Sequence, residues 1–305
     1  MPELPEVQTI VDDLKKRVVG KTIVDFWTDT PKIIKKPSLK EFRKKLPGSL
    51  IVDVQRIGKN IVFTLKLKTK KSSSDSNMIM LVHQKMTGHF LIGNWDLKKV
   101  GRKTIVIPKT KGPISSDKYN SYIRMIFYFD NGTQMALSDL RKFAKVILIP
   151  QKDADNLKDL KDLGPDVFSK KIDSDYLYSI FQKRKKAVKP ILLEQQVVSG
   201  IGNIYGDESL FIAGINPLTK SNILSKKETA KIINSARKVI KKSLKLRGIS
   251  SSDYRDTYGE KGGYDKVRFV YDREGLPCRI CQTEIKRVKI GQRSSYFCSH
   301  CQKLK

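Results

Sequence analysis

The 305-residue chain has few acidic side chains for its size. Its 31 Asp and Glu stand against 61 Lys and Arg, which leaves a formal net charge of +30. An excess this large predicts a polyanionic partner and salt-dependent binding, and it carries no information about the fold. A lysine-rich proteome is the alternative explanation for part of this charge.

Long apolar runs are also missing. No run reaches the roughly 18 to 20 residues that a membrane-spanning helix needs, so we expect no membrane partner. The first residues lack a basic segment followed by an apolar core, so we expect no secretory signal. The chain is therefore expected to stay in the reducing compartment in which it is made, the cytoplasm.

Cysteine is scarce and confined to one end, because all four cysteines lie in the last 28 residues. Cys278 and Cys281 are two residues apart, as are Cys298 and Cys301, and such pairs can close a tetrahedron around zinc. Disulfides are the alternative, and they fit poorly with a reducing compartment. His300 could replace one cysteine as a ligand. Four protein ligands leave no open position, so we expect one structural zinc ion and no organic cofactor.

Residues 21 to about 149 are dominated by short runs of β-branched and aromatic residues, which predict a β-sandwich or barrel. The expected strands cover residues 23–27, 50–57, 60–67, 78–82, 123–129, 135–137 and 146–149. Residues 68–77 are dominated by Lys and Ser, and residues 96–121 hold a short apolar run among basic residues. Both stretches are expected to be inserted solvent loops.

From about residue 150 the spacing of apolar residues becomes helical, with helices expected over residues 177–184, 189–198, 207–213 and 225–246. Ser225 and Glu228 form a plausible capping box for the last of them. Residues 248–264 are polar and glycine-rich, which predicts a mobile, functional loop. We therefore expect an α+β multidomain chain divided into residues 1–150, 151–265 and 266–305.

The first residues can carry chemistry. If Met1 is removed, Pro2 has a secondary amine that can attack an aldehyde-like carbon and form a charged iminium. Glu3 and Glu6 follow at the start of a helix whose apolar stripe begins at Val7, and the positive end of that helix disfavours protonation of a nearby amine. The alternative is that these prolines and acids only mark a helix start.

Five further motifs accompany this terminus. They are Arg56-Ile57-Gly58-Lys59-Asn60, His83-Gln84-Lys85-Met86-Thr87-Gly88, Asp139-Leu140-Arg141-Lys142-Phe143, Ser199-Gly200-Ile201-Gly202-Asn203-Ile204-Tyr205, and a basic hairpin with Arg293 between the cysteine pairs. Together with the start Met1-Pro2-Glu3-Leu4-Pro5-Glu6-Val7, they resemble the formamidopyrimidine-DNA glycosylase family of bacterial base-excision repair enzymes.

The resemblance covers essentially the whole chain. It implies an N-terminal β-sandwich domain with an N-terminal helix, a helix-two-turn-helix domain carrying a lesion-recognition loop, and a C-terminal zinc ribbon. The catalytic residues that it implies are Pro2, Glu3, Lys59 and Arg293. The DNA-binding residues that it implies are Met86, Arg141, Lys142, Phe143, Lys185 and Asn203, and the zinc ligands are Cys278, Cys281, Cys298 and Cys301.

The implied activity is that of a bifunctional glycosylase and AP lyase, which excises oxidised purines from damaged double-stranded DNA and cuts the strand by β- and δ-elimination. The protein would act as a monomer, associated with the nucleoid of a prokaryotic host. The alternatives are an endonuclease VIII-like enzyme for oxidised pyrimidines and a non-catalytic DNA-damage-binding protein. The sequence departs from the family at three places: Lys142 replaces an arginine, a DNA-contacting histidine of the family is replaced near Tyr122, and Arg247-Gly248 replaces a pair of glycines.

Overall fold

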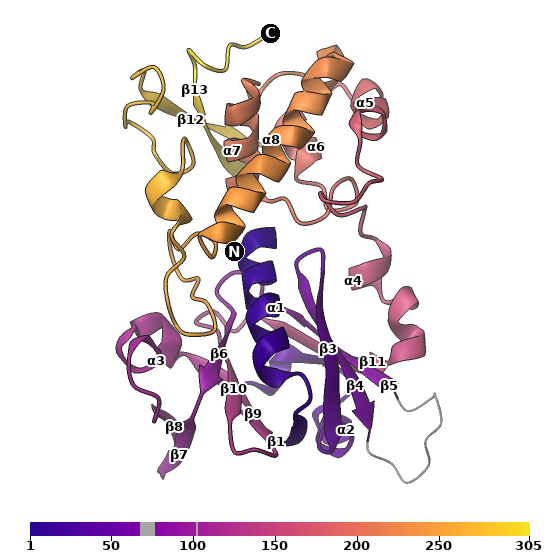
Figure 1. Cartoon of the computed structure of the whole chain (residues 1–305), viewed down its shortest axis with the longest axis vertical. Coiled ribbons are helices and arrows are strands. Elements are labelled where there is room, and N and C mark those ends of the chain that lie inside the picture. The colour runs from indigo at the N-terminus through magenta and orange to yellow at the C-terminus, as the bar shows by residue number, and fades with distance from the viewer. Residues whose placement is uncertain (68–76, 102) are drawn as a thin grey trace. The chain divides into compact units, whose positions relative to one another are not determined.

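The computed structural model describes residues 1–67, 77–101 and 103–305, and their contacts group them into two compact units (Figure 1). Unit 1 comprises Met1–Lys161 and Arg247–Gly263, and unit 2 comprises Asp162–Leu246 and Tyr264–Lys305. The segment Arg247–Gly263, which the sequence assigns to the helical domain, thus has its contacts in unit 1. The finer division at residues 150 and 265 stays a prediction.

Unit 1 is built on a sheet whose described strands follow the order β2-β11-β5-β4-β3-β1-β9-β10-β6. The strands are β1 Thr22–Thr28, β2 Ile34–Lys36, β3 Ser49–Ile57, β4 Asn60–Leu67, β5 Asn77–His83, β6 His89–Gly93, β9 Ile123–Phe129, β10 Gln134–Ser138 and β11 Lys145–Pro150. Neighbouring strands are antiparallel except β2 and β11, which are parallel. Each run that the sequence assigns to a strand lies within one of them.

The sheet folds over on itself. Phe63 of β4 and Phe90 of β6 have ring centroids 5.8 Å apart, although four strands, β3, β1, β9 and β10, lie between β4 and β6 in the sheet order. In a flat sheet, strands so far apart would lie roughly 24 Å from each other, because neighbours are spaced by about 4.8 Å. The two ends of the sheet therefore enclose one apolar core, as the predicted sandwich requires.

Helix α1, Leu4–Val18, contributes its apolar stripe to this core. Val7, Ile10 and Leu14 are fully buried, and Glu3 and Glu6 close a capping box at the N-terminus of the helix. Gly20, with φ of +84°, follows the last turn in a conformation that glycine adopts without strain. The predicted helix is confirmed.

The prediction of a solvent loop over residues 96–121 is wrong. Its described residues form a hairpin, β7 Trp95–Val100 and β8 Lys103–Pro108, followed by the short helix α3 Pro113–Ser116 and a 3₁₀ turn, Lys118–Ser121. The lysines suggest a loop, yet buried Trp95 and Ile114 anchor the segment to a second small core. Of the other predicted loop, residues 68–76 lie outside the described residues, and Asn77 already belongs to β5.

Unit 2 contains helices α5 Ser174–Gln182, α6 Val188–Leu192, α7 Asn203–Ala213 and α8 Lys226–Lys245, and the hairpin of β12 Ile285–Ile290 and β13 Arg293–Cys298. Figure 1 shows α7 and α8 side by side, and the hydroxyls of Tyr205 and Ser243 join them at 2.6 Å. The capping box of Ser225 and Glu228 is confirmed at the start of α8.

Unit 1 also holds the short helices α2 Leu39–Lys45 and α4 Lys158–Lys161.

Helix α6 is shorter than the predicted helix over residues 189–198. The side chain of Gln195 donates to the carbonyls of Leu193 and Ile201 and accepts from the amide of Gly200. These local hydrogen bonds compete with helical ones, and the chain continues in turns up to α7. Within the described part of the chain, every helix is too short or too polar to cross a membrane.

Candidate active site and zinc ribbon

The start of α1 buries two carboxylates directly behind Pro2. Glu3 is 2% exposed and Glu6 is 1% exposed. Glu6 Oε2 accepts a hydrogen bond from the amide of Glu3 at 2.8 Å, and its Oε1 accepts one from the amide of Ile249 at 2.9 Å. Glu6 thus caps the helix and fixes the backbone next to Pro2.

Lys59 lies in the two-residue turn between β3 and β4 and is buried. Gly58 precedes it with φ of +59°, which lets the turn close tightly. Arg56 holds the turn to α1, because its Nε donates to Gln8 Oε1 at 2.8 Å and its Nη1 donates to the carbonyl of Gly58. The lysine turn and the first turns of α1 are therefore joined through one arginine.

Two connections, residues 84–88 and 139–144, meet through the fully buried carboxylate of Asp139. Asp139 Oδ1 accepts from the hydroxyl of Thr87, and Oδ2 accepts from the amide of Ala144 at 2.7 Å. The amide of Arg141 donates to Thr87 Oγ1 at 3.0 Å. Because the two connections are bound in this way, the side chains that they carry project from a single site.

The side chains that this site presents are apolar and cationic. Met86 is 42% exposed and Phe143 is 51% exposed, both high for large apolar residues. The guanidinium of Arg141 lies over the Phe143 ring at 4.8 Å. Lys142 adopts a left-handed backbone with φ of +57°, which reverses the chain between these two neighbours.

The predicted residues of unit 1 lie at one end of its sheet. Asn60, next to Lys59, pairs with His83 at the end of β5, and His83 pairs in turn with Lys145 at the start of β11. The last residue of β10 pairs with the first of β6. The structure therefore brings Lys59 and the connections that carry Met86, Arg141, Lys142 and Phe143 to the same edge.

His83 stays uncharged within this cationic group. Burial, followed by the positive charges of Lys85 and Lys59, lowers its pKa from 6.5 to about 4. Between these two pH values the unfolded chain therefore binds more protons at His83 than the folded chain does. The contribution of neutral His83 to the free energy of unfolding is complete above pH 6.5 and is lost as the pH falls through about 4.

We expect His83→Asn, whose amide can still accept from the amide of Lys85, to weaken the acid sensitivity of unit 1. Both tryptophans, Trp27 and Trp95, lie in this unit, so their fluorescence during urea unfolding at pH 7 and pH 5 reports its stability. His300→Ala in the zinc ribbon is the control. An equal loss of stability on acidification in the wild type and His83→Asn would contradict this role.

The four cysteines of unit 2 fit one zinc ion. Their Sγ atoms all lie within 4.8 Å of one another. Three of the separations are 3.4 Å for Cys281 and Cys298, 3.5 Å for Cys281 and Cys301, and 3.9 Å for Cys278 and Cys301. A tetrahedron with Zn–S bonds of about 2.3 Å has edges of about 3.8 Å, so the four positions match its geometry.

The thiol chemistry also suits a metal. Hydrogen bonding by Thr283 lowers the pKa of Cys281 to about 6, whereas burial raises the pKa of Cys298 and of Cys301, so a shared cation is needed to hold all four as thiolates. Thiolates are the form that binds zinc. Cys278 and Cys298 are fully buried in a small core with Val270, Ile285 and Tyr296. The ion therefore replaces part of the apolar core that a segment of this size lacks.

The first half of β13, which begins at Arg293, is held by α6 and α7. Lys189 Nζ donates to the carbonyl of Ser294 at 2.9 Å and to Ser295 Oγ at 2.8 Å, and forms a buried ion pair with Asp207 at 2.7 Å. Burial raises the pKa of Asp207 to about 7, against the opposing charge of Lys189. Asn203 Nδ2 donates to the same Ser294 carbonyl at 3.1 Å. Arg293 and Asn203 are thus brought to one place.

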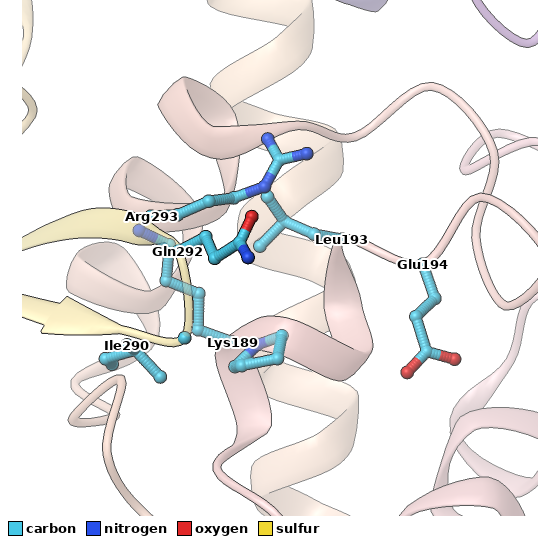
Figure 2. A pocket seen from close by; sticks show the side chains of 8 residues that line it. Lys189, Leu193, Glu194, Ile290, Gln292 and Arg293 are labelled. Carbon is cyan, nitrogen blue, oxygen red and sulfur yellow. The ribbon is translucent and has the colours of Figure 1, made fainter.

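A pocket of about 290 Å³ lies beside Arg293, between α6 and the hairpin. Figure 2 shows the side chains of Gln292 and Arg293 extending from the hairpin toward Leu193. Leu193, Pro190 and Ile290 give it an apolar wall, and Arg293 supplies a positive charge at its edge. Glu194 also lines the pocket, so its wall carries charges of both signs.

Sequence reasoning misses the most constrained lysine of this region. Lys185, the predicted DNA contact, is exposed on the segment before α6, whereas Lys189 is 1% exposed and joins three elements. Position 189 lies in the apolar phase of the short helix, between Val188 and Ile191, which are fully buried. A lysine in an apolar stripe is the signal that points to a buried ion pair.

The fold and these two groups of residues define the class. The chain is a basic, multidomain zinc protein with a proline at position 2, two buried acids directly behind it and exposed large apolar side chains, as expected of an enzyme that acts on nucleic acid. Three family models match the chain. They are the formamidopyrimidine-DNA glycosylase N-terminal domain over residues 1–146, the formamidopyrimidine-DNA glycosylase H2TH domain over 163–255, and the zinc finger found in FPG and IleRS over 275–304.

Complete proteins match as well. The formamidopyrimidine-DNA glycosylase of Pelotomaculum thermopropionicum is 32% identical over 305 residues, covering 100% of both chains. That of Prochlorococcus marinus is 35% identical and covers 99% of this chain and 100% of the relative. The Lactococcus lactis Fpg, solved in complex with DNA containing an abasic site, superposes with a TM-score of 0.83 at 27% identity, covering 99% of this chain and 100% of the other.

The chain belongs to the formamidopyrimidine-DNA glycosylase family. It is accordingly a DNA glycosylase and AP lyase of base excision repair, with a zinc finger whose four cysteines are clustered for one ion. A further family structure, MutM in complex with DNA containing carbocyclic 8-oxo-G, superposes with a TM-score of 0.81 at 28% identity over 99% of this chain and all of the other.

Proposed function

We propose that this protein excises oxidised purines, such as 8-oxoguanine and formamidopyrimidines, from double-stranded DNA with Pro2 as the nucleophile. The observation that carries the proposal is the arrangement at the start of α1. Glu6 fixes the amide of Glu3, both acids are buried, and Pro2 precedes them. Removal of Met1 turns the nitrogen of Pro2 from an inert amide into a secondary amine.

In the proposed reaction, the nitrogen of Pro2 attacks C1′ of the damaged nucleotide and the bond from C1′ to the base breaks. Glu3 transfers a proton at the deoxyribose as the sugar ring opens, and the nitrogen and C1′ form an iminium. The iminium acidifies C2′, and loss of a C2′ proton expels the 3′ phosphate. A second elimination expels the 5′ phosphate, and hydrolysis of the iminium regenerates the amine.

Cationic residues have two parts in this scheme. Lys59, buried in its turn beside α1, binds a phosphate of the damaged strand and assists proton transfer. In unit 2, Arg293, Asn203 and Lys185 bind backbone phosphates, and an anion at Asn203 also benefits from the N-terminus of α7. Such contacts position the substrate without reading its sequence.

The exposed side chains of the two joined connections keep the damaged nucleotide outside the helix. Met86 and Phe143 fill the space that it leaves, and Arg141 with Lys142 faces the remaining strand. Apolar insertion of this kind offsets the few kcal/mol that unstacking a base costs. The high exposure of Met86 and Phe143 supports this role, because large apolar residues are exposed at a cost unless a partner covers them.

We further propose that the protein acts on chromosomal DNA in the cytoplasm of a prokaryotic host, as a monomer. The supporting observations are the formal charge of +30 and the bacterial origin of the relatives. The charge favours association with any long polyanion at low salt.

Purine preference is tested by base release from two duplexes, one holding 8-oxoguanine opposite cytosine and one holding an oxidised pyrimidine. We expect the first to be processed at least about tenfold faster, a difference of about 1.4 kcal/mol in activation free energy. Faster release of the oxidised pyrimidine would instead favour the alternative function, that of an endonuclease VIII-like enzyme. Binding to both duplexes without any base release would favour the damage-binding protein.

A further inference from the structure

The segment Arg247–Gly263 contains no helix or strand, yet it is held on both sides. On one side Arg255 Nε donates to Asp117 Oδ2 at 2.7 Å, and Asn120 Nδ2 donates to the carbonyl of Gly259 at 3.1 Å. Both partners belong to the segment 96–121. On the other side, its contacts run to α1 and include the carboxylate of Glu6.

Arg247 makes the central contact with α1. Its Nη2 lies 2.5 Å from Asp13 Oδ2, on α1, and its Nε lies 2.7 Å from Asp256 Oδ2, in the loop. The two carboxylates are 6% and 2% exposed. One guanidinium therefore bridges two buried acids, a task that needs separate donors in a rigid plane and that the single ammonium of a lysine does not match.

The backbone of Arg247 is held in an unfavourable conformation. Its φ is +60°, in the left-handed region that residues with a side chain rarely adopt. A glycine would take this conformation without strain, so the backbone alone gives no reason for an arginine here. The side-chain contacts give one, because they join the loop to α1 at this position.

The contacts continue from Arg247 to the catalytic terminus. Gly248 follows with φ of +86°, and a Cβ atom there would lie 2.8 Å from Glu6 Oε1. The next amide, that of Ile249, donates to Glu6 Oε1 at 2.9 Å. Glu6 in turn accepts from the amide of Glu3 through Oε2. The position of residues 248 and 249 therefore determines where Glu6 holds the backbone of Glu3, adjacent to Pro2.

We propose that Arg247 is a positioning residue for the nucleophile: its two ion pairs fix residues 248–249 so that Glu6 orients Glu3 and Pro2. Without Arg247, Asp13 and Asp256 are left as two buried like charges without their shared cation, and they separate. Thr257 Oγ1, which donates to Asp13 Oδ2 at 2.8 Å, remains as a neutral partner of Asp13. This inference rests on the proposed role of Pro2.

The test is the single-turnover rate at which borohydride traps the protein on DNA with a preformed abasic site. This substrate has no base, so the rate reports attack by Pro2 and not recognition of a lesion. We expect Arg247→Gly and Arg247→Lys to trap about tenfold to a hundredfold more slowly at saturating DNA, because misplacing a reacting group by about 1 Å has effects of this size. The apparent DNA affinity should change by less than about threefold, since the variants leave the phosphate contacts in place.

Two variants make the result specific. Asp117→Asn removes the ion pair between Asp117 and Arg255, which holds the same loop on its other side. This ion pair does not involve Glu6, so the variant should trap at the wild-type rate. Asp13→Asn should slow trapping, and the double variant with Arg247→Gly should be no slower than Arg247→Gly alone, because both changes break one interaction. Amide hydrogen exchange at Ile249 should rise in Arg247→Gly and remain at the wild-type value in Asp117→Asn.

The outcomes separate this inference from the proposed function. If the wild type forms no adduct, Pro2 is not the nucleophile and the proposed function fails. If the wild type forms an adduct and Arg247→Gly forms it equally fast, the positioning role is wrong and the proposed function stands. Equal slowing by Arg247→Gly and Asp117→Asn would show a general effect of loop order and would overturn the specific link through Glu6.

Discussion

Pro2→Gly is expected to lose base excision by at least about a hundredfold, or about 2.7 kcal/mol of transition-state stabilisation. The variant keeps a terminal amine after removal of Met1, but this amine is primary. It lacks the ring that fixes its direction, and its imine must gain a proton before it withdraws electrons as the iminium of proline does. The rate is measured as base release from the 8-oxoguanine duplex under single-turnover conditions.

Pro5→Ala is the matched control. Pro5 is the other buried proline of the N-terminus, but its nitrogen lies within the chain and is never a nucleophile. Alanine is well tolerated in the first turn of a helix, where the extra amide needs no intrahelical partner. Pro5→Ala should therefore keep most of the activity. Comparable activity of Pro2→Gly and the wild type, with both proteins folded and free of Met1, would remove Pro2 from the reaction.

Loss of zinc is expected to have the second largest effect. Cys278→Ser leaves three thiolates for the ion, and structural zinc sites contribute about 10–16 kcal/mol of binding free energy that also folds their segments. Cys278 and Cys298 belong to the core beneath the hairpin, so hairpin order should be lost with the metal. Arg293 would then no longer be held through Ser294 by Lys189 and Asn203.

We expect the wild type to contain one zinc per chain and Cys278→Ser to contain less than about a tenth of that, given the loss of one of four ligands. Strand cleavage should fall at least about a hundredfold, the scale on which such a loss of a positioned cation acts. His300→Ala is the control, because His300 is exposed and lies outside the cysteine cluster. Full zinc content and cleavage in Cys278→Ser would contradict the assigned ligand set.

Local patterns are the part of this structure that the sequence predicts well. The stripe from Val7 to Val18, the capping box at Ser225 and the spacing of the four cysteines each depend on residues close together in the chain, and the structure agrees with all three. The sequence also predicts the strands well, because a separate β-branched run marks each of them. The prediction of a loop over the basic segment 96–121 is wrong because its basic composition masks the β-branched run from Thr104 to Ile107 in β8.

Contacts between distant residues account for what the sequence does not reveal. Arg247 and Asp13 are 234 positions apart, and no local pattern pairs one arginine among the many cations of the chain with one aspartate. Asp139 is visible as part of a motif, but its hydrogen bond to Thr87, which joins the connections that carry Met86 and Phe143, is not. The burial of Lys189 likewise depends on Asp207 and on β13, which lie on other elements.

The identity of the nucleophile is tested most directly by borohydride trapping on the 8-oxoguanine duplex, followed by mass spectrometry of the digested adduct. The account predicts a sugar remnant on a peptide that begins at Pro2, lacks Met1 and carries the added mass on its terminal nitrogen. An adduct on a lysine, such as Lys59, or efficient excision by protein that retains Met1, would contradict it.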